Sequence, residues 1–197
     1  MQGANSTIAY FNDYIIKHIT CDELDQPLNI AAAREFYFTT LAKTTYPYIP
    51  DVFSLNNTKI TMQRINGTRL DDYIVNYPST DTFIRLSDKV SHAVNSILAS
   101  RIYHGDVTYT NLIVDDAQNL WVIDFGISTP LCKHSNISDE YLHIMGVFFD
   151  TLNDFLLYKG LQSVIPLNYP LMITALKHYI HPDLKSRYNS TYGINLH

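Results

Sequence analysis

The segment His104–Gly126 holds side chains whose types and spacing suit phosphoryl transfer. It contains Asp106, then Asn111, and the triplet Asp124-Phe125-Gly126 after a short apolar run. In this chemistry one carboxylate orients or deprotonates the acceptor, while an asparagine and a second carboxylate hold the magnesium that bridges the ATP phosphates. Each pattern alone occurs by chance, but their order and spacing favour one shared site. We therefore predict Asp106 as catalytic, and Asn111 and Asp124 as ligands of magnesium and ATP.

A site of this kind also needs a lysine on a strand, held by a glutamate on a helix. Lys17 ends the β-prone run Tyr-Ile-Ile-Lys, and Glu35 lies in the Ala-rich segment 28–43. Their pairing would fix an ammonium where phosphate charge accumulates, so both are predicted as catalytic residues and Lys17 also as an ATP contact. Two unrelated surface charges are the alternative. Lys43 is the nearest other lysine, but it follows the predicted helix, which is the wrong geometry.

Two further segments are predicted to border the nucleotide. Gly3, the one glycine before Lys17, would lie in the loop that covers the phosphates and is predicted as an ATP contact. The segment 62–67 resembles the hinge of a kinase fold, whose backbone hydrogen-bonds adenine, and Gly67 would supply a flexible turn after it. The predicted ATP contacts of the hinge, with the first at the gatekeeper position, are Met62, Gln63, Arg64 and Ile65.

The elements that must position these residues divide into two groups. In the first, β-prone runs flank Asn12-Asp13 and Asn56-Asn57, which predicts two hairpins, 6–19 and 52–62, with a helix over 28–43 between them. The sequence predicts the α+β class: a two-lobed protein-kinase-like fold with a small β-rich N-lobe carrying one helix, residues 1–66, and a helical C-lobe, residues 67–197.

The second group is mostly helical. Apolar residues three or four apart predict a long amphipathic helix over 83–98 that runs towards Tyr103. A helix over 141–158 is apolar on nearly all sides, so we expect it to be buried in the centre of its lobe. The other predicted elements are strands at 112–114 and 120–123, a helix at 170–180 and a frayed tail at 189–197.

Composition restricts the class of protein. The chain has 197 residues, of which 46% are hydrophobic and 17% charged, and its net charge of −5 gives no general attraction to nucleic acid. Cys21 and Cys132 lie in no metal-binding pattern, so we expect free, buried thiols in a reducing compartment. The polar N-terminus and the lack of a run of about 18 apolar residues predict neither a signal peptide nor a membrane span. We expect a cytoplasmic or nuclear protein that does not bind membranes.

Several blocks of residues resemble one kinase family. QGANS, YIIKHI, MQRINGTRL, HGDVTYTN and IDFGIS, between residues 2 and 128, are similar to QGAEA, IVKHR, MEYIEG, HGDLTTSN and IDFGLS of the PRPK-type kinase subunit of the KEOPS complex. The resemblance implies a small atypical serine/threonine protein kinase, or an ATPase, that uses ATP and magnesium. It also implies a protein partner, either a KEOPS-like subunit or a protein substrate. Transfer RNA, whose threonylcarbamoyl-adenosine that complex makes, would be met only through the complex.

The chain departs from this family at identifiable places. Gln63 replaces a hinge glutamate, and the basic tail is reduced to Lys185 and Arg187. His143 lies where the family tends to have an aspartate that braces the catalytic loop, so we expect a looser loop. A lone histidine on an apolar helix is otherwise interpreted as a core residue with its polar atoms satisfied. No arginine stands directly before Asp106, so control by a phosphorylated loop is not expected.

Two other functions stay open. A pseudokinase or decoy could keep the kinase shape to occupy a partner protein, in line with the short phosphate-covering loop. A small-molecule kinase of the aminoglycoside or choline type shares the HGD-x4-N and IDFG signatures. The 15 tyrosines and 7 glycines suggest an AT-rich coding genome, which would fit a compact viral or parasite version of the family.

Overall fold

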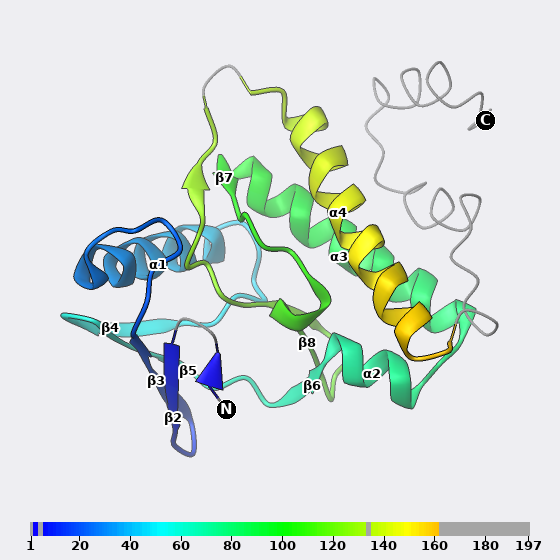
Figure 1. Cartoon of the computed structure of the whole chain (residues 1–197), viewed down its shortest axis with the longest axis horizontal. Coiled ribbons are helices and arrows are strands. Elements are labelled where there is room, and N and C mark those ends of the chain that lie inside the picture. The colour runs from blue at the N-terminus through cyan, green and yellow to red at the C-terminus, as the bar shows by residue number, and fades with distance from the viewer. Residues whose placement is uncertain (1, 4–5, 133–134, 162–197) are drawn as a thin grey trace.

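The N-terminal part is an antiparallel sheet with one helix packed on it (Figure 1). The computed structural model describes residues 2–3, 6–132 and 135–161. Within them the sheet has the strand order β1-β2-β3-β5-β4. Both predicted hairpins are confirmed, and in the second turn Asn57 adopts the left-handed conformation that asparagine tolerates (φ 54°). The strands are β1 (Gln2–Gly3), β2 (Ser6–Tyr10), β3 (Tyr14–Ile19), β4 (Val52–Asn56) and β5 (Lys59–Gln63).

Helix α1 (Leu28–Lys43) has the predicted bounds and lies against β3, β4 and β5. Its inner face buries Ala31, Ala32 and Glu35, and Glu35 follows the two alanines by four and three residues, as one helix face requires. The two alanines pack with Ile19 and Ile60 of the sheet in a small apolar cluster. Small side chains let the helix approach the strands closely, so the one carboxylate on this face is brought to the sheet.

The C-terminal part is built on two long helices, α3 (Thr80–Ala99) and α4 (Ile137–Tyr158), which contact each other. Ser79 caps α3, because its Oγ accepts the Thr82 N–H at 3.1 Å. Apolar residues of both helices form the main core, which extends to the end of α1. The helix over 141–158 is not buried on nearly all sides as predicted, since Val147, Leu157 and Tyr158 are exposed.

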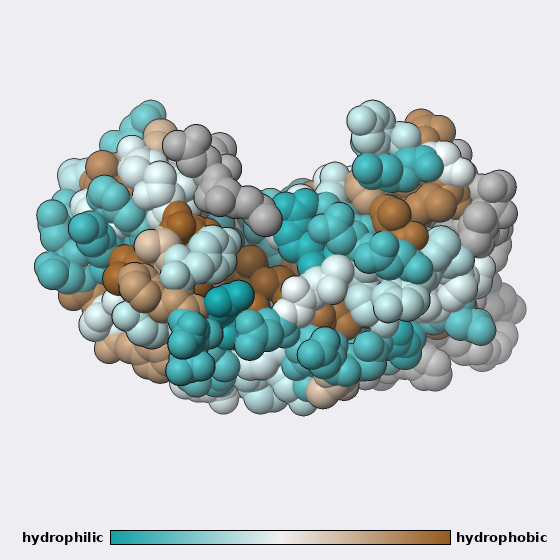
Figure 2. Space-filling view, turned by 90° about the horizontal axis from the view of Figure 1, so that it is seen from below, coloured by the Kyte–Doolittle hydropathy of each residue, from teal (hydrophilic) through white to brown (hydrophobic). Residues whose placement is uncertain are grey.

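The long helices support a second, smaller sheet, which includes part of the segment 104–126. Its order is β6-β8-β9, all antiparallel, and the two predicted strands at 112–114 and 120–123 are β8 and β9. Figure 2 shows a hollow in the outline of the molecule, between two larger parts. Strand β8 spans Leu112–Asp115 and β9 spans Leu120–Val122. The remaining elements, none of which was predicted, are β6 (Gly67–Arg69), α2 (Leu70–Asn76), β7 (Ile102–Tyr103), η1 (Tyr109–Asn111) and β10 (Thr129–Pro130).

Two predictions about the rest of the chain have different outcomes. The predicted helix at 170–180 and the tail at 189–197 lie outside the described residues. Among the helices that are described, none combines the length and the apolar character that crossing a membrane requires.

Gly67 is needed for close packing, not for the flexible turn that the sequence suggested. It lies in β6, and a Cβ there would stand 2.5 Å from Val114 O and 2.7 Å from Ile113 Cγ2. We expect Gly67→Ala to lower the free energy of unfolding by about 1–3 kcal/mol, because backbone atoms of β8 must shift. Gly146→Ala in α4 is the control: its Cβ meets nothing within 4 Å, so it should be neutral or stabilising by up to about 1 kcal/mol. Urea unfolding of both variants measures the difference.

Candidate active site

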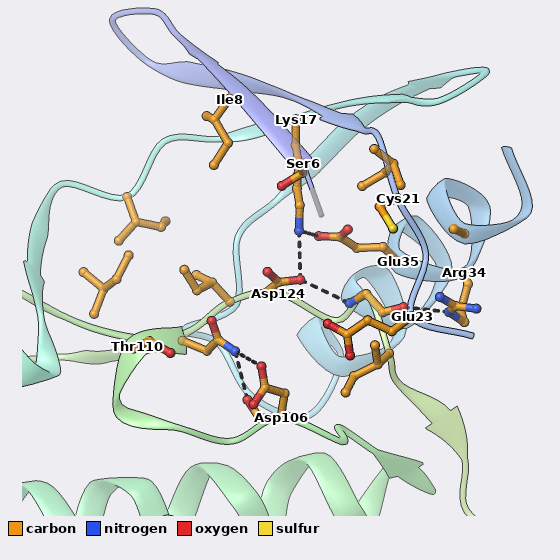
Figure 3. A pocket seen from close by; sticks show the side chains of 18 of the residues that line it. Ser6, Ile8, Lys17, Cys21, Glu23, Arg34, Glu35, Asp106, Thr110 and Asp124 are labelled. Atoms are coloured by element: carbon orange, nitrogen blue, oxygen red, sulfur yellow. Dashed lines mark hydrogen bonds and ion pairs between the residues drawn. The ribbon is translucent and has the colours of Figure 1, made fainter. Parts of the chain in front are cut away.

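A cleft of about 750 Å³ lies between the N-terminal sheet and the β6-β8-β9 sheet. Its volume is in the range of sites that bind small molecules and cofactors. Charged side chains from both parts of the chain enter it, and Figure 3 shows Lys17, Glu35, Asp106 and Asp124 converging there. Apolar side chains border it as well: Ile8, Ile65, Ile113 and Ile123.

Lys17 contacts two carboxylates at once. Its Nζ lies 2.8 Å from Glu35 Oε1 and 2.8 Å from Asp124 Oδ1. Lys17 points to the face of β3 that packs on α1, where Glu35 is the buried carboxylate, and Asp124 follows β9. Residues 107 positions apart therefore meet at one ammonium. The structure brings the predicted lysine and glutamate together with the aspartate of the Asp-Phe-Gly triplet.

The environment keeps this ammonium charged. Burial opposes the charge on Lys17, but Glu35 and Asp124 outweigh it, so the pKa of Lys17 lies above its usual range. Burial also opposes ionisation of Asp124, yet the attraction of Lys17 holds the pKa of Asp124 below its usual range. Glu35 is fully enclosed, and burial raises its pKa in spite of Lys17. The ion pair with Asp124, whose side chain is 44% exposed, would open towards a ligand more readily than the buried pair with Glu35.

Asp106 and Asn111 form a second polar pair on the other side of the cleft. The Asn111 amide Nδ2 donates to Asp106 Oδ2 at 2.6 Å and to the Asp106 carbonyl at 3.0 Å. Burial, together with the charges of Asp124 and Glu23, raises the pKa of Asp106, although the hydrogen bond from Asn111 opposes this. A carboxylate with a raised pKa is a better proton acceptor, which suits a general base.

The backbone around Asp106 is fixed by buried hydrogen bonds. His104 Nδ1 accepts the Asp106 N–H at 3.2 Å, so its Nε2–H donates to the Ile123 carbonyl, also at 3.2 Å. Ser128 Oγ donates to the His104 carbonyl at 2.9 Å. These bonds tie the catalytic loop to the segment around Asp124, so the two aspartates are positioned together.

The backbone at Gly105, directly before Asp106, leaves no room for a side chain. Its φ is +86°, a conformation that residues with a Cβ rarely adopt, and a Cβ would lie 3.1 Å from the Ile127 carbonyl oxygen. The path of the loop therefore requires a glycine at position 105.

Asn111 and Asp124 are the described residues best suited to hold magnesium. Because the Asn111 Nδ2 is used by Asp106, the amide oxygen is left as the available ligand. Asp124 contributes an ionised carboxylate on the open side of the cleft. In the part of the chain that the structure describes, no three His, Cys, Asp or Glu side chains are grouped to hold a metal ion. This donor set fits magnesium, which commonly uses one or two protein ligands with substrate phosphates and water.

The four predicted hinge residues separate into two pairs. Arg64 and Ile65 line the cleft. Met62 is buried in the small cluster beneath the sheet, and the Gln63 N–H donates to the Asp51 carbonyl at 2.7 Å. Neither Met62 nor Gln63 is among the described residues that line the cleft. Adenine recognition by this segment stays a prediction, with Arg64 and Ile65 as the parts of it that line the cavity.

The outcomes for the phosphate-covering loop and the other lysine are simple. Gly3 lies in β1 opposite Ser6, whose side chain lines the cleft, and its contact with ATP stays a prediction. Lys43 is directed elsewhere, since its Nζ donates to the Ile49 carbonyl at 2.7 Å and pairs with Asp51 at 3.2 Å.

Two predictions about burial are wrong. Cys21 and Cys132 are free thiols, but both are exposed, and Cys21 lines the cleft. His143 is exposed and not part of the core, with its ring stacked beside Tyr103 at 6.5 Å between centroids. Its helix turns this position outward, because Tyr141, Ile144 and neighbouring apolar residues occupy the inner face.

Sequence reasoning missed four charged residues at this site, one of which is Arg69 in β6. Asp22 and Glu23, in the connection from β3 to α1, and Arg34 on α1 all line the cleft. Arg34 directly precedes Glu35, which was the available signal, but its partners lie in other segments and no local pattern points to them.

His104 should make stability depend on pH. Burial lowers the pKa of His104 from 6.5 to about 4, so between these values the unfolded chain takes up a proton that the folded chain does not. The folded state is therefore destabilised as the pH falls, by about 3 kcal/mol in total from this group. We expect the wild type to lose that much more free energy of unfolding than His104→Gln between pH 7 and pH 4. Urea unfolding at pH 7 and at pH 4 measures this loss for each protein. An equal loss in the wild type and in His104→Gln would contradict the assignment.

Comparison with known proteins agrees with this arrangement. A probable bifunctional tRNA threonylcarbamoyladenosine biosynthesis protein of Methanosarcina mazei is 33% identical over 79 residues, which is 40% of this chain and 13% of that protein. A solved structure of WbdD with a kinase inhibitor superposes with a TM-score of 0.60 at 18% identity, over 94% of this chain and 46% of that one. The chain thus spans less than half the length of each.

The structural likeness to WbdD concerns the fold alone, and it confirms the predicted α+β, two-lobed, kinase-like architecture. A family model described as the ABC1 atypical kinase-like domain matches residues 12–151. The match begins in the turn before β3 and includes most of α4. That range contains Lys17, Glu35, Asp106, Asn111 and Asp124. The chain belongs to the ABC1 atypical kinase-like domain family.

Proposed function

We propose that this protein is a magnesium-dependent phosphotransferase that uses ATP. One observation carries the proposal: Lys17 lies 2.8 Å from both Glu35 and Asp124 across the cleft from Asp106 and Asn111. Lys17 would contact the α- and β-phosphates, and Glu35 would hold the ammonium in place. Magnesium, held by Asn111 and Asp124, would neutralise charge on the transferred phosphoryl group.

The other residues of the cleft have roles that follow from their positions. Ile8 and Ile113, which come from the two parts of the chain, would contact the two faces of adenine, and the linker at Ile65 would border it. Asp106 would orient the acceptor hydroxyl and take its proton. Protein serine or threonine is the acceptor that the PRPK-like motifs suggest, and ATP hydrolysis is the corresponding reaction with water.

The test is turnover of MgATP by the purified chain, with and without an acceptor protein. We expect turnover to require magnesium, so EDTA should remove it and added magnesium should restore it. Asp124→Asn should lower turnover at least about 100-fold, because it removes a charge from the metal site. Turnover that is unchanged by EDTA and by Asp124→Asn would contradict the proposal. A thermal-shift screen with aminoglycosides, choline and nucleosides tests the small-molecule alternative.

A protein-binding role is the second candidate function. Ile30 and Tyr37, seven residues apart on the outer face of α1, are 49% and 58% exposed, and Phe53 of β4 is 58% exposed. Ile30 and Tyr37 share one exposed face of α1, so this face is the candidate contact with another protein. The relative from M. mazei suggests a partner in tRNA threonylcarbamoyladenosine biosynthesis, which co-purification would test. If the chain acts only as a binding module, Asp106→Asn, which is expected to keep the fold, should leave partner binding and biological effect unchanged.

A further inference from the structure

One arginine joins three separate segments around the site. Arg34 Nε donates to the Gly126 carbonyl at 2.7 Å, and Arg34 Nη1 donates to Gln26 Oε1 at 3.0 Å. Its Nη2 forms an ion pair with Asp22. The two charged side chains are 11% and 4% exposed, so the ion pair is largely shielded from water. We call Arg34 and these three partners the Arg34 clasp (Figure 3 shows Arg34 beside the cleft).

Asp22, the anionic member of the Arg34 clasp, is held in place by a second hydrogen bond. Asp22 also accepts the Gln26 N–H at 2.9 Å, which holds the connection between β3 and α1 in a compact turn. Burial opposes ionisation of Asp22, but the hydrogen bonds from Arg34 and Gln26 outweigh it and keep the pKa of Asp22 below its usual range. A planar guanidinium with several fixed donors can serve the three acceptors together, whereas an ammonium on a flexible stem cannot.

The position of the clasp connects the two carboxylates that hold Lys17. Arg34 is the residue before Glu35, and Gly126 is the second residue after Asp124. If α1 moved away from the sheet, or if the Asp-Phe-Gly segment turned, the bond between Arg34 and the Gly126 carbonyl would break. Both motions would also separate a carboxylate from Lys17.

We propose that Arg34 is a positioning residue that couples α1 to the Asp-Phe-Gly segment, so that Glu35 and Asp124 engage Lys17 together. Its catalytic consequence rests on the proposed function, but the coupling itself does not. Gly105, and not an arginine, directly precedes Asp106 in this chain. The clasp gives it a constitutive means of ordering the site, without a phosphorylated loop.

Crystal structures without nucleotide test the coupling directly. Arg34→Lys keeps the positive charge and loses the fork of donors, and we expect Glu35 or Asp124 to leave its 2.8 Å contact with Lys17. Should that variant fail to fold, Asp22→Asn weakens the same clasp from its other side. Arg85→Lys is the matched control, because Arg85 donates to Gln118 on the far side of the second sheet. If both contacts of Lys17 persist after Arg34→Lys and Asp22→Asn, the proposal is overturned.

Turnover then measures the consequence for catalysis. Arg34→Lys should lower kcat roughly 10- to 100-fold, since displacement of a catalytic group by about 1 Å has effects of this size. Adding Glu35→Gln should lower it less than about threefold further, because both changes disturb the same contact. Independent, multiplying losses would contradict a shared role. Absence of turnover in the wild type would reject the proposed function, while the crystal structures would still decide the role of Arg34.

Discussion

Asp106→Asn is expected to lower phosphoryl transfer from MgATP roughly 10²- to 10⁴-fold, the usual contribution of a positioned general base. The substitution removes the negative charge and the ability to accept the acceptor's proton. It keeps nearly the same shape, so a carbonyl oxygen can still accept the hydrogen bond from Asn111. We therefore expect kcat to fall while the KM for ATP changes little, since Asp106 would face the acceptor hydroxyl and not the adenine in the proposed arrangement.

The measurement separates chemistry from folding. Thermal unfolding of Asp106→Asn, with and without MgADP, should match the wild type, which shows that the nucleotide still binds. Asp116→Asn is the control, because Asp116 is an exposed residue of the β8–β9 turn. A loss of activity confined to KM, or an equal loss in both variants, would show that Asp106 does not perform the assigned role.

Much of the fold and site follows from local patterns. The helix at 28–43 has its predicted bounds because proline precedes it and its buried face is mostly small or apolar, with Glu35 as the charged exception. The two hairpins follow from turn residues between β-prone runs. Lys17, Asp106, Asn111 and Asp124 could be identified because phosphoryl transfer restricts both their types and their order in the chain.

What could not be predicted depends on contacts between distant segments. Helix α2 has seven residues, too few to be stable alone, and it forms because Leu70 and Ile74 are buried in the main core. The role of Gly67 depends on the close approach of Val114 in the paired strand β8. In the sequence Arg34 is indistinguishable from a surface charge, because its acceptor, the Gly126 carbonyl, lies 92 residues away along the chain.

Lys17→Met is expected to lower the free energy of unfolding at pH 7 by about 3–5 kcal/mol, the usual effect of removing one partner from a buried ion pair. The methionine fills the space of the lysine stem, so packing is largely kept. What is lost is the partner of Glu35, which is 1% exposed and already has one oxygen, Oε2, without a hydrogen bond. Lys59→Met, at an exposed position of the neighbouring strand β5, is the control and should change stability by less than about 0.5 kcal/mol.

The pH dependence of this loss identifies its cause. Burial raises the pKa of Glu35, and removing Lys17 raises it further, so the carboxyl of the variant takes up a proton more easily folded than unfolded. A raised pKa in the folded state gives stability that is present at low pH and is lost as the pH rises through that pKa. The deficit of Lys17→Met should therefore shrink as the pH falls from 7 towards 4.5. Adding Glu35→Met should also recover most of the stability at pH 7, since no buried charge is then left. A deficit that is independent of pH and is not relieved by the second substitution would mean that packing, not the buried charge, determines the loss.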